Sequence, residues 1–457
     1  MGERRLLLII GDVVASIGAT LGALLLWSNL DWLGFSWEFV RDRASWFIWL
    51  PLLWMFLLLH LYDMRRAGSW TETIRGILLS GSIGVVLYLA VYFSSEPGAL
   101  PRRGILYFLI LAVILTLLWR RIYLWVFTAP QFMRRTLIVG AGFGGQDFIK
   151  VLHEFQPPPF YTVGLIDDDE QKQGQEIGGA KVLGTSRELI SIVQSEAVTD
   201  IIVAIQGEMN GRMFQTLLDA QERGVQITRM PVAYEELMGR VPINHLASDW
   251  VLRSFVDEVQ ASTLYTGVKR MLDIVGGLFG LTIFALIYPW VALATLIESG
   301  RPVLFFQGRL GRGGREFGLV KFRTMGQDAE ADGIPHWAEA EDPRITRVGK
   351  ILRKTHLDEF PQFWNVLVGD MSLVGPRPER PELVLDLEKQ IPFYRARLLV
   401  KPGITGWAQV NYGKGASIQG SAEKLEYDLY YIKHRSLIMD LNSILRTLGS
   451  IIGLQGV

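Results

Sequence analysis

The chain has 457 residues, of which 49% are hydrophobic, with 14 tryptophans and 23 phenylalanines. This composition is unusual for a soluble protein of two or three domains and indicates membrane segments. There are 46 basic and 46 acidic residues, so the formal net charge is zero. This charge favours neither nucleic acid nor an acidic partner, and we expect no nucleic-acid partner. Cysteine is absent, which excludes disulfides, thiolate nucleophiles and cysteine-ligated metals.

Four apolar stretches fill the first quarter of the chain. They cover residues 6–27, 46–62, 74–93 and 104–127. Each is close to the roughly 20 residues that a helix needs to cross a bilayer, and tryptophan and tyrosine lie near their ends. We therefore predict a bundle of four transmembrane helices over residues 1–130. The alternative is a set of buried helices in a soluble bundle.

Arginines near the ends of these stretches predict the orientation of the bundle. One side carries Arg4, Arg5, Arg65, Arg66, Arg75, Arg134 and Arg135, and the other carries Arg41, Arg43, Arg102 and Arg103. Cytoplasmic loops are enriched in basic residues, so the first side is predicted to be cytoplasmic and both ends of the bundle to lie inside. No small-residue cleavage site follows the first apolar run, so we expect no cleaved signal peptide.

Residues 131–261 alternate between short apolar strands and helices, which is typical of a doubly wound parallel sheet. The first strand is expected near Thr136, and Gly140, Gly142 and Gly145 follow it as G-x-G-x-x-G. A second strand ends at Asp167, at the spacing of a dinucleotide-binding fingerprint. The same glycines also serve a tight turn and close helix packing. We therefore predict a Rossmann-like domain and leave its binding of a dinucleotide open.

A fifth apolar run covers residues 271–297 and has Pro289 near its centre. Proline removes a helical hydrogen bond and clashes with the preceding turn. A complete crossing would place the domains before and after it on opposite sides of the membrane. A helix broken at Pro289 that enters and returns would keep both in the cytoplasm. We favour this re-entrant helix and predict that it begins an α/β domain over residues 262–457.

The densest group of charged residues in that domain is Arg353-Lys354-Thr355-His356-Leu357-Asp358-Glu359. Pro361 is best tolerated in the first turn of a helix, which places Asp358 near a helix N-terminus that favours anions. An ionised carboxylate there can attack a phosphoryl group and form an acyl-phosphate. The competing interpretation is structural: Thr355 and Asp358 form a capping pattern, and Arg353 and Glu359 a surface ion pair.

Phosphoryl transfer between anions requires cations around the transition state. The domain supplies many, namely Arg309, Arg312, Arg315, Lys321, Arg323, Arg344, Arg347, Arg353 and Arg377. Arginine binds phosphate through two parallel hydrogen bonds, so this supply fits a phosphate substrate.

Several separate motifs after residue 262 resemble the monotopic phosphoglycosyl transferases. They are KRMLD (269–273), VKFRTM (320–325), DPRITRVGKILRKTHLDEFPQFWNVLVGDMSLVGPRPE (342–379) and KPGITGWAQVNYG (401–413). The layout as a whole resembles the large form of that family, and the stretch 411–437 is similar to the exopolysaccharide polyprenyl glycosylphosphotransferases. His356 and Phe360 depart from the family's usual Ser and Leu, which leaves every charged group of the motif in place.

The resemblance implies a reaction and roles. A hexose-1-phosphate would pass from a UDP-sugar to undecaprenyl phosphate, with release of UMP and a covalent phosphoaspartyl-sugar intermediate, at the start of exopolysaccharide or O-antigen synthesis. Asp358 would be the nucleophile and a Mg²⁺ ligand, and Glu359, the second catalytic residue, would help to position Mg²⁺ or the acceptor. Lys321, Arg323, Arg353 and Arg377 would bind substrate phosphates.

The resemblance also implies a bacterial inner membrane location, with the catalytic domain on the cytoplasmic face. A homodimer is left open. One rival interpretation is a membrane-bound NAD-dependent sugar-nucleotide dehydratase or epimerase, because Tyr265 and Lys269 form a Tyr-x-x-x-Lys pair. The other is a non-enzymatic membrane scaffold or nucleotide sensor.

Overall fold

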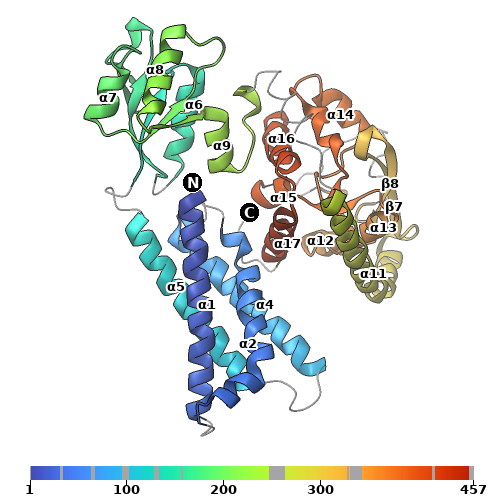
Figure 1. Ribbon diagram of the computed structural model, residues 1–457. Helices are drawn as coiled ribbons and strands as arrows, with labels where there is room; N and C mark the ends of the chain where they lie inside the picture. The colour runs from blue at the N-terminus through green and yellow to red at the C-terminus, as the bar shows by residue number, and fades with distance from the viewer. Residues whose placement is uncertain are drawn as a thin grey trace. The chain divides into compact units, whose positions relative to one another are not determined.

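The computed structural model describes residues 2–30, 34–62, 67–94, 102–127, 133–155, 158–245, 263–326, 329, 342–413 and 417–451. The chain divides into two compact units, Met1–Met238 and Gly239–Val457. The first unit holds a helical bundle and an α/β sheet, and the second holds a long apolar helix with the α/β elements that follow it (Figure 1). Arg65 and Arg66, which contribute to the predicted orientation of the bundle, lie outside the described residues.

The bundle consists of α1 (Gly2–Leu30), α2 (Trp37–Leu57), a short 3-10 helix η1 (Leu59–Leu61), α4 (Trp70–Ser94) and α5 (Arg102–Phe127). Small residues allow α1 and α5 to pack closely, since Ala19 and Ala23 are fully buried and a Cβ on Gly11 would overlap Trp119. Large apolar side chains such as Val14 face outward instead. This inverted arrangement is expected of helices surrounded by lipid.

Three helices of the bundle are long and apolar enough to cross a membrane, over Arg5–Leu30, Trp70–Ser94 and Arg102–Val126. The predicted span 46–62 differs from these. Its helix α2 begins with the charged residues Glu38, Arg41, Asp42 and Arg43, and its apolar part is only Phe47–Leu57. The second predicted span is therefore confirmed as an apolar helix, but α2 ends at Leu57, and the 3-10 helix η1 covers part of the apolar residues that follow.

A buried ion pair joins α1 to α5. Asp12 accepts a hydrogen bond from Arg120 at 2.7 Å, and Arg120 also donates to the Leu61 carbonyl at 3.2 Å. Both side chains are almost completely buried. A charge among apolar helices is costly unless it is paired, so the pair fixes the register of the two helices.

The α/β part of the first unit is a six-stranded sheet in the order β3-β4-β2-β1-β5-β6. Its strands are β1 (Arg135–Val139), β2 (Tyr161–Ile166), β3 (Glu176–Ile177), β4 (Ala180–Gly184), β5 (Asp200–Val203) and β6 (Gln226–Arg229). Neighbours are parallel except for β3 and β4. Its helices are α6 (Phe143–His153), η3 (Glu170–Lys172), α7 (Leu189–Ser195), α8 (Gly211–Glu222) and α9 (Met230–Met238). Separate apolar clusters cover its two faces, which confirms the doubly wound sheet.

The glycine motif after β1 serves the fold. Gly140 has a φ of +108°, and a Cβ on Gly145 would lie 2.0 Å from the Gly140 carbonyl oxygen. Asp167, which a dinucleotide ribose would need, accepts a hydrogen bond from the Ala141 amide at 2.7 Å and pairs with Lys172. The Asp167 carboxylate is held against this turn and would repel a phosphate group bound there. Turn geometry and packing therefore account for Gly140 and Gly145.

Two substitutions in this motif separate packing from ligand binding. Gly145→Ala places a methyl group against backbone and is expected to lower the melting temperature of the purified protein by several degrees, equivalent to about 1–3 kcal/mol. Gly142→Ala is the matched control, because a Cβ there meets no atom within 4 Å. Equal melting temperatures for both variants would contradict the packing role.

The second unit opens with a 3-10 turn η4 (Ile243–His245) and the long helix α11 (Thr263–Ser299). A hairpin follows, with β7 (Leu304–Leu310), η6 (Arg312–Gly314) and β8 (Glu316–Phe322). Then come α12 (Arg347–Lys354), η7 (Leu357–Gln362), α13 (Phe363–Val368), β9 (Ser372–Val374), α14 (Pro381–Leu387), η8 (Tyr394–Leu399), β10 (Gly403–Thr405), α15 (Trp407–Asn411), α16 (Ile418–Lys433) and α17 (Leu437–Ile451). The core packs α15, α16 and α17 around β9 and η8.

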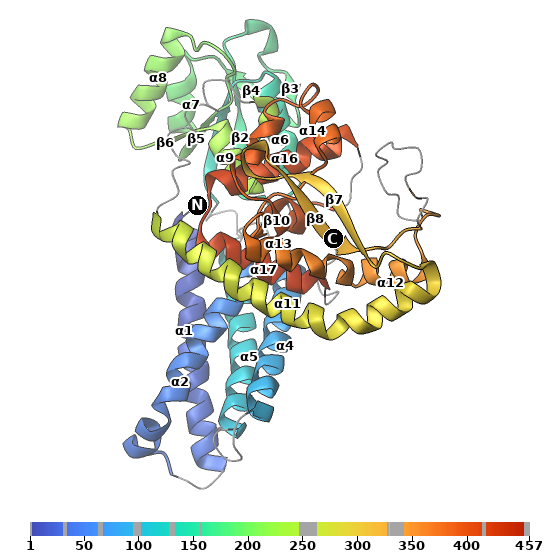
Figure 2. The same ribbon diagram turned by 90° about the vertical axis from the view of Figure 1, so that its right-hand side faces the viewer.

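Helix α11 is continuous through Pro289, so the predicted break is wrong, and the helix extends beyond the predicted range 271–297 on both sides. Figure 2 shows that the helix bends along its length, as a proline within a helix favours. Its outer face is strongly apolar and exposed, with Phe279, Trp290 and Ile297 each at least 69% exposed. Its inner face packs on α13, where Gly280 leaves room for the ring of Phe363.

Candidate active site

The predicted carboxylate pair lies on η7, between α12 and α13. His356, just before η7, has a φ of +55°, which turns the chain sharply after α12. Thr355 does not cap η7, because the N-cap position is His356 and no side chain accepts a capping hydrogen bond there. The Thr355 hydroxyl donates to the Ile351 carbonyl at 2.8 Å. Glu359 does not pair with Arg353; its partner is Arg377, at 2.8 Å. Neither of the structural interpretations of the dyad matches the observed contacts.

Arg377 reaches Glu359 from the Gly-Pro-Arg-Pro turn after β9. Burial opposes ionisation of Glu359, yet its pKa is lowered because the guanidinium lies against the carboxylate. In return, the carboxylate raises the pKa of Arg377 further above its ordinary value. The Glu359 side chain is 18% exposed and that of Arg377 is 53% exposed, so the arginine keeps a face open to a ligand.

A second buried arginine supports this turn from behind. Arg397 donates to the Arg377 carbonyl at 3.0 Å, to Asp428 at 2.9 Å and to the Tyr394 hydroxyl at 2.7 Å. Arg397 and Asp428 are both buried. Neither residue could be predicted from the sequence, because Arg397 and Asp428 are 31 positions apart on different elements and form no local motif.

Asp358 has an unusual electrostatic environment. Burial and the neighbouring charge of Glu359 raise its pKa to about 6, and Lys321, Arg353 and Arg377 oppose that rise. The three cations come from β8, α12 and the turn after β9. Segments far apart in the sequence therefore place positive charge around one carboxylate, as a phosphoryl-transfer site needs.

Lys321 lies on β8, close enough to interact electrostatically with both the carboxylate dyad and the arginines around it. Burial lowers its pKa to about 8, Arg309 and Arg377 lower it further, and Asp358 opposes them. Asn365 of α13 ties this strand to the helix that follows the dyad, since its amide donates to the Gly318 carbonyl at 2.8 Å and accepts from the Val320 amide at 3.2 Å. The hairpin and the dyad are thus held together.

One nitrogen of the Arg353 guanidinium is available to a ligand. Its Nη1 atom is buried and has no hydrogen-bond partner among the residues that the structure describes. A buried, unsatisfied guanidinium nitrogen is costly, and an anionic ligand would satisfy it. Its charge lowers the pKa of Asp358, which places it near the dyad.

Arg323, predicted to bind substrate, is used elsewhere. Its guanidinium donates to the carbonyls of Ser299, Gly300 and Arg301 at the end of α11. A cation at the carboxyl end of a helix stabilises it through the helix dipole. Within the described part of the chain no hydrogen bond joins Arg323 to the dyad, so its observed contacts brace the end of α11 and its substrate-binding role stays a prediction.

The described residues contain no group of three or more histidines, aspartates and glutamates that could hold a metal. Mg²⁺ is often bound by one or two carboxylates together with substrate phosphates, so such a group is not required. Glu359 raises the pKa of Asp358, and a cation at Asp358 would relieve that repulsion. The dyad therefore fits Mg²⁺ chemically, with Asp358 as the carboxylate that is not ion-paired.

The Tyr265–Lys269 pair is part of the packing of α11. Tyr265 donates to Asp440 at 3.1 Å, and Lys269 donates to Asp440 at 2.9 Å and to the Val374 carbonyl at 3.1 Å. These contacts fix the start of α11 to α17 and β9. Nothing in this arrangement favours a dehydratase.

The fold and the site together define a membrane-associated protein with a cation-surrounded carboxylate dyad. The sequence profile of the bacterial sugar transferases matches residues 264–453, and that of a CoA-binding domain matches residues 57–231. The chain belongs to the bacterial sugar transferase family, the polyprenyl glycosylphosphotransferases, as its motifs predict.

Three curated relatives illustrate the similarity. UDP-N-acetylgalactosamine-undecaprenyl-phosphate N-acetylgalactosaminephosphotransferase of Aeromonas hydrophila is 42% identical over 48% of this chain and 50% of its own length. UDP-glucose:undecaprenyl-phosphate glucose-1-phosphate transferase of Xanthomonas campestris pv. campestris is 32% identical over 62% and 58%. The protein of the same name from Caulobacter vibrioides is 43% identical over 40% and 69%. The chain thus spans about half the length of the first two relatives.

Proposed function

We propose that the chain transfers a hexose-1-phosphate from a UDP-sugar to a polyprenyl phosphate such as undecaprenyl phosphate. The observation that carries this proposal is the convergence of Lys321, Arg353 and Arg377 on Asp358. Such an arrangement suits a carboxylate that attacks a phosphorus atom, because the cations offset the repulsion between two anions. The relatives are named for transfer between UDP-sugars and undecaprenyl phosphate, and these names support the same reaction class.

In the first half-reaction a carboxylate oxygen of Asp358 attacks the β-phosphorus of the donor. A phosphorus–oxygen bond to the carboxylate forms, and the bond from that phosphorus to the α,β-bridging oxygen breaks. UMP leaves with the bridging oxygen. In the second half-reaction an oxygen of the acceptor phosphate attacks the same phosphorus, and the Asp358 carboxylate is regenerated. No oxidant or additional proton donor is required.

The surrounding residues take distinct parts. Arg353 offers its unpaired Nη1 to a phosphate oxygen, and Arg377 offers its exposed face while its other side holds Glu359 in place. Lys321 adds a compact positive charge beside the dyad. A Mg²⁺ ion bound through Asp358 and donor phosphates would supply further charge neutralisation. Glu359 keeps its ion pair with Arg377 and so sets the position of both.

The proposed membrane arrangement would allow both substrates to reach the dyad. The bend of α11 (Figure 2) and its exposed apolar face support a re-entrant helix. Such a helix would keep the sheet domain and the catalytic unit both on the cytoplasmic side of a bacterial inner membrane. The dyad would then lie at the height of the lipid headgroups. A soluble nucleotide sugar and a lipid phosphate can both reach that level.

The proposal predicts a bell-shaped dependence of kcat/KM on pH. Asp358 must be ionised to attack, and its pKa of about 6 means that activity falls as the pH drops below that value. Lys321 must be protonated to carry charge, and its pKa of about 8 means that activity falls above that value. Lys321→Arg, whose side chain stays protonated, should remove the alkaline fall. A flat profile between pH 5 and 9, measured as initial rates, would contradict these assignments.

The reaction itself is tested by release of UMP from UDP-sugars, with and without undecaprenyl phosphate. The relatives' names contain glucose, galactose and N-acetylgalactosamine, so those three donors form the first panel. We expect UMP release and a sugar-phosphate lipid product with one of them. Tight NAD binding with hydride transfer and no UMP would instead support the dehydratase interpretation. Absence of both activities would support a scaffold.

A further inference from the structure

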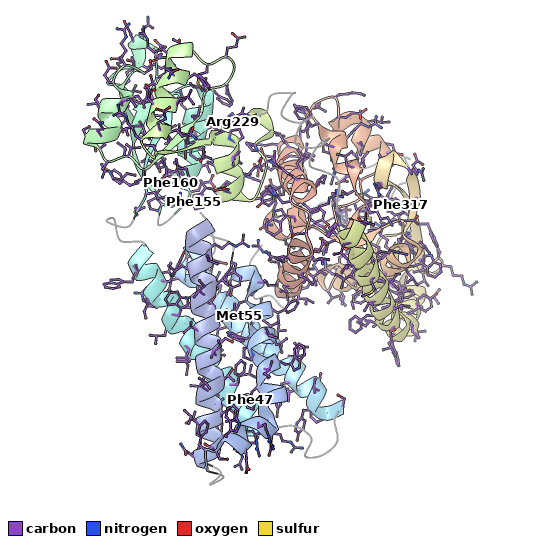
Figure 3. The ribbon with its side chains drawn as sticks, in the orientation of Figure 1. Phe47, Met55, Phe155, Phe160, Arg229 and Phe317 are labelled. Carbon is purple, nitrogen blue, oxygen red and sulfur yellow. The ribbon has the colours of Figure 1, made fainter. Side chains whose placement is uncertain are left out.

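A cavity of about 540 Å³ lies at the turn of the β7–β8 hairpin, in the second unit. Its lining includes Arg312, Arg315, Glu316 and Phe317 from the hairpin, and Asp370 and Lys401 from the segments beside it. Phe317 is labelled in Figure 3. Lys321, the hairpin residue next to the dyad, is five residues along β8 from Glu316, which corresponds to roughly 17 Å of extended strand. The cavity is therefore distinct from the dyad.

The charges in this cavity favour an anion. Arg312, Arg315 and Lys401 form no ion pair or side-chain hydrogen bond within the described parts of the chain, and two carboxylates, Glu316 and Asp370, stand against them. Burial lowers the pKa of Lys401, the nearby charges of Arg270 and Arg312 lower it further, and the carboxylates of Asp273 and Asp370 oppose them. Like charges gathered without a partner are destabilising unless a ligand compensates them.

The backbone leaves the cavity open to a phosphate group. Gly313 and Gly314 have φ values of +71° and +76°, so the turn adopts a conformation that favours glycine and adds no side chain there. Gly369, with a φ of +100°, lets the Lys401 ammonium approach the end of α13, since a Cβ there would lie 3.4 Å from it. The last carbonyls of α13 do not repel an anion, because those of Val366 and Leu367 accept hydrogen bonds from Arg270.

An apolar surface adjoins this charged cavity. Val368, immediately before Gly369, is 51% exposed, and Met271 and Val275, which follow Arg270 on α11, are 63% and 60% exposed. A ligand that fits both surfaces carries a phosphate on a hydrocarbon chain. This step rests on the proposed placement of α11 in the membrane.

We propose that the cavity binds the phosphate headgroup of a membrane lipid, whose hydrocarbon lies along Val368 and the start of α11. The headgroup is held by Arg312, Arg315 and Lys401 through charge-assisted hydrogen bonds. The site is separate from the dyad and provides a second point at which a lipid phosphate contacts the catalytic unit.

Native mass spectrometry of the full chain in a neutral detergent tests this site. The probes are dioleoyl phosphatidic acid, dioleoylglycerol with the same chains but no phosphate, and inorganic phosphate. We expect wild-type protein to retain phosphatidic acid at least about fivefold better than dioleoylglycerol. The triple variant R312Q/R315Q/K401Q is expected to lose that preference. A matched triple variant of exposed cations elsewhere, K181Q/R223Q/K389Q, is expected to keep it.

The double variant R312Q/R315Q alters only exposed turn residues and provides the same test if Lys401 proves necessary for folding. Equal retention of the two lipids, or equal retention by the two triple variants, would refute the site. Displacement of phosphatidic acid by millimolar inorganic phosphate would assign the cavity to a soluble phosphate and overturn the lipid proposal. UMP release is measured separately on the same preparations, so a protein that binds the lipid without releasing UMP would refute only the transferase.

Discussion

Asp358→Asn is expected to reduce UMP release by at least about 1,000-fold, the scale of losses seen when a covalent nucleophile is removed. The amide is nearly the same size but is a poor nucleophile and carries no charge. It also removes a negative charge that burial and the neighbouring Glu359 carboxylate both disfavour. The variant should therefore fold at least as well as the wild type, and its melting temperature in detergent should not fall.

The matched control for this experiment is Asp386→Asn. Asp386 is an exposed carboxylate on α14 whose contact is an ion pair with Lys389 at 3.3 Å. Surface pairs of this kind contribute little, so activity and melting temperature are expected to stay at wild-type levels. If Asp358→Asn retained near wild-type turnover, Asp358 would not be the nucleophile.

Arg377→Ala is expected to lower kcat by roughly 100- to 1,000-fold, the range observed when one stabilising donor is removed from a transition state. It removes a cation from the donor phosphates and leaves Glu359 without its partner. Arg377 lowers the pKa of both Asp358 and Lys321, so its loss should raise both values. The residual pH profile should therefore move as a whole to higher pH.

Arg377→Lys provides the control, since it keeps the charge but cannot form the paired guanidinium contacts. It should restore most of the pH profile and only part of the rate. A loss of rate with both limbs of the profile unmoved would mean that Arg377 does not act through the dyad. The comparison requires only initial rates of UMP release over a range of pH.

Much of the site could be predicted from sequence because its charged residues occur in contiguous motifs. Asp358, Glu359 and Arg353 lie within seven positions of one another, and Arg377 lies in a recognisable Pro-Arg-Pro turn. The structure brings all of them into one electrostatic group with Lys321. The motif left open whether Glu359 pairs with Arg353. The observed partner is Arg377, because the turn after β9 folds back onto the dyad.

Other features depended on contacts between distant segments. Arginine is a residue type that commonly binds phosphate, but the Arg323 guanidinium is directed to the end of α11, where it donates to the Ser299 carbonyl. Arg397 and Asp428 matter through burial beneath the Arg377 turn, which no local pattern indicates. Pro289 was expected to break the helix, yet it lies inside α11, which continues past it to Ser299.

The most direct test of the proposed covalent mechanism is mass spectrometry of the protein. The protein is first incubated briefly with a UDP-sugar and Mg²⁺ in the absence of any lipid acceptor and is then quenched with acid. We expect one equivalent of UMP per protein and a peptide containing Asp358 that is heavier by one sugar phosphate. Addition of undecaprenyl phosphate before the quench should remove that adduct. UMP release only in the presence of the lipid, with no adduct on Asp358, would contradict a covalent mechanism.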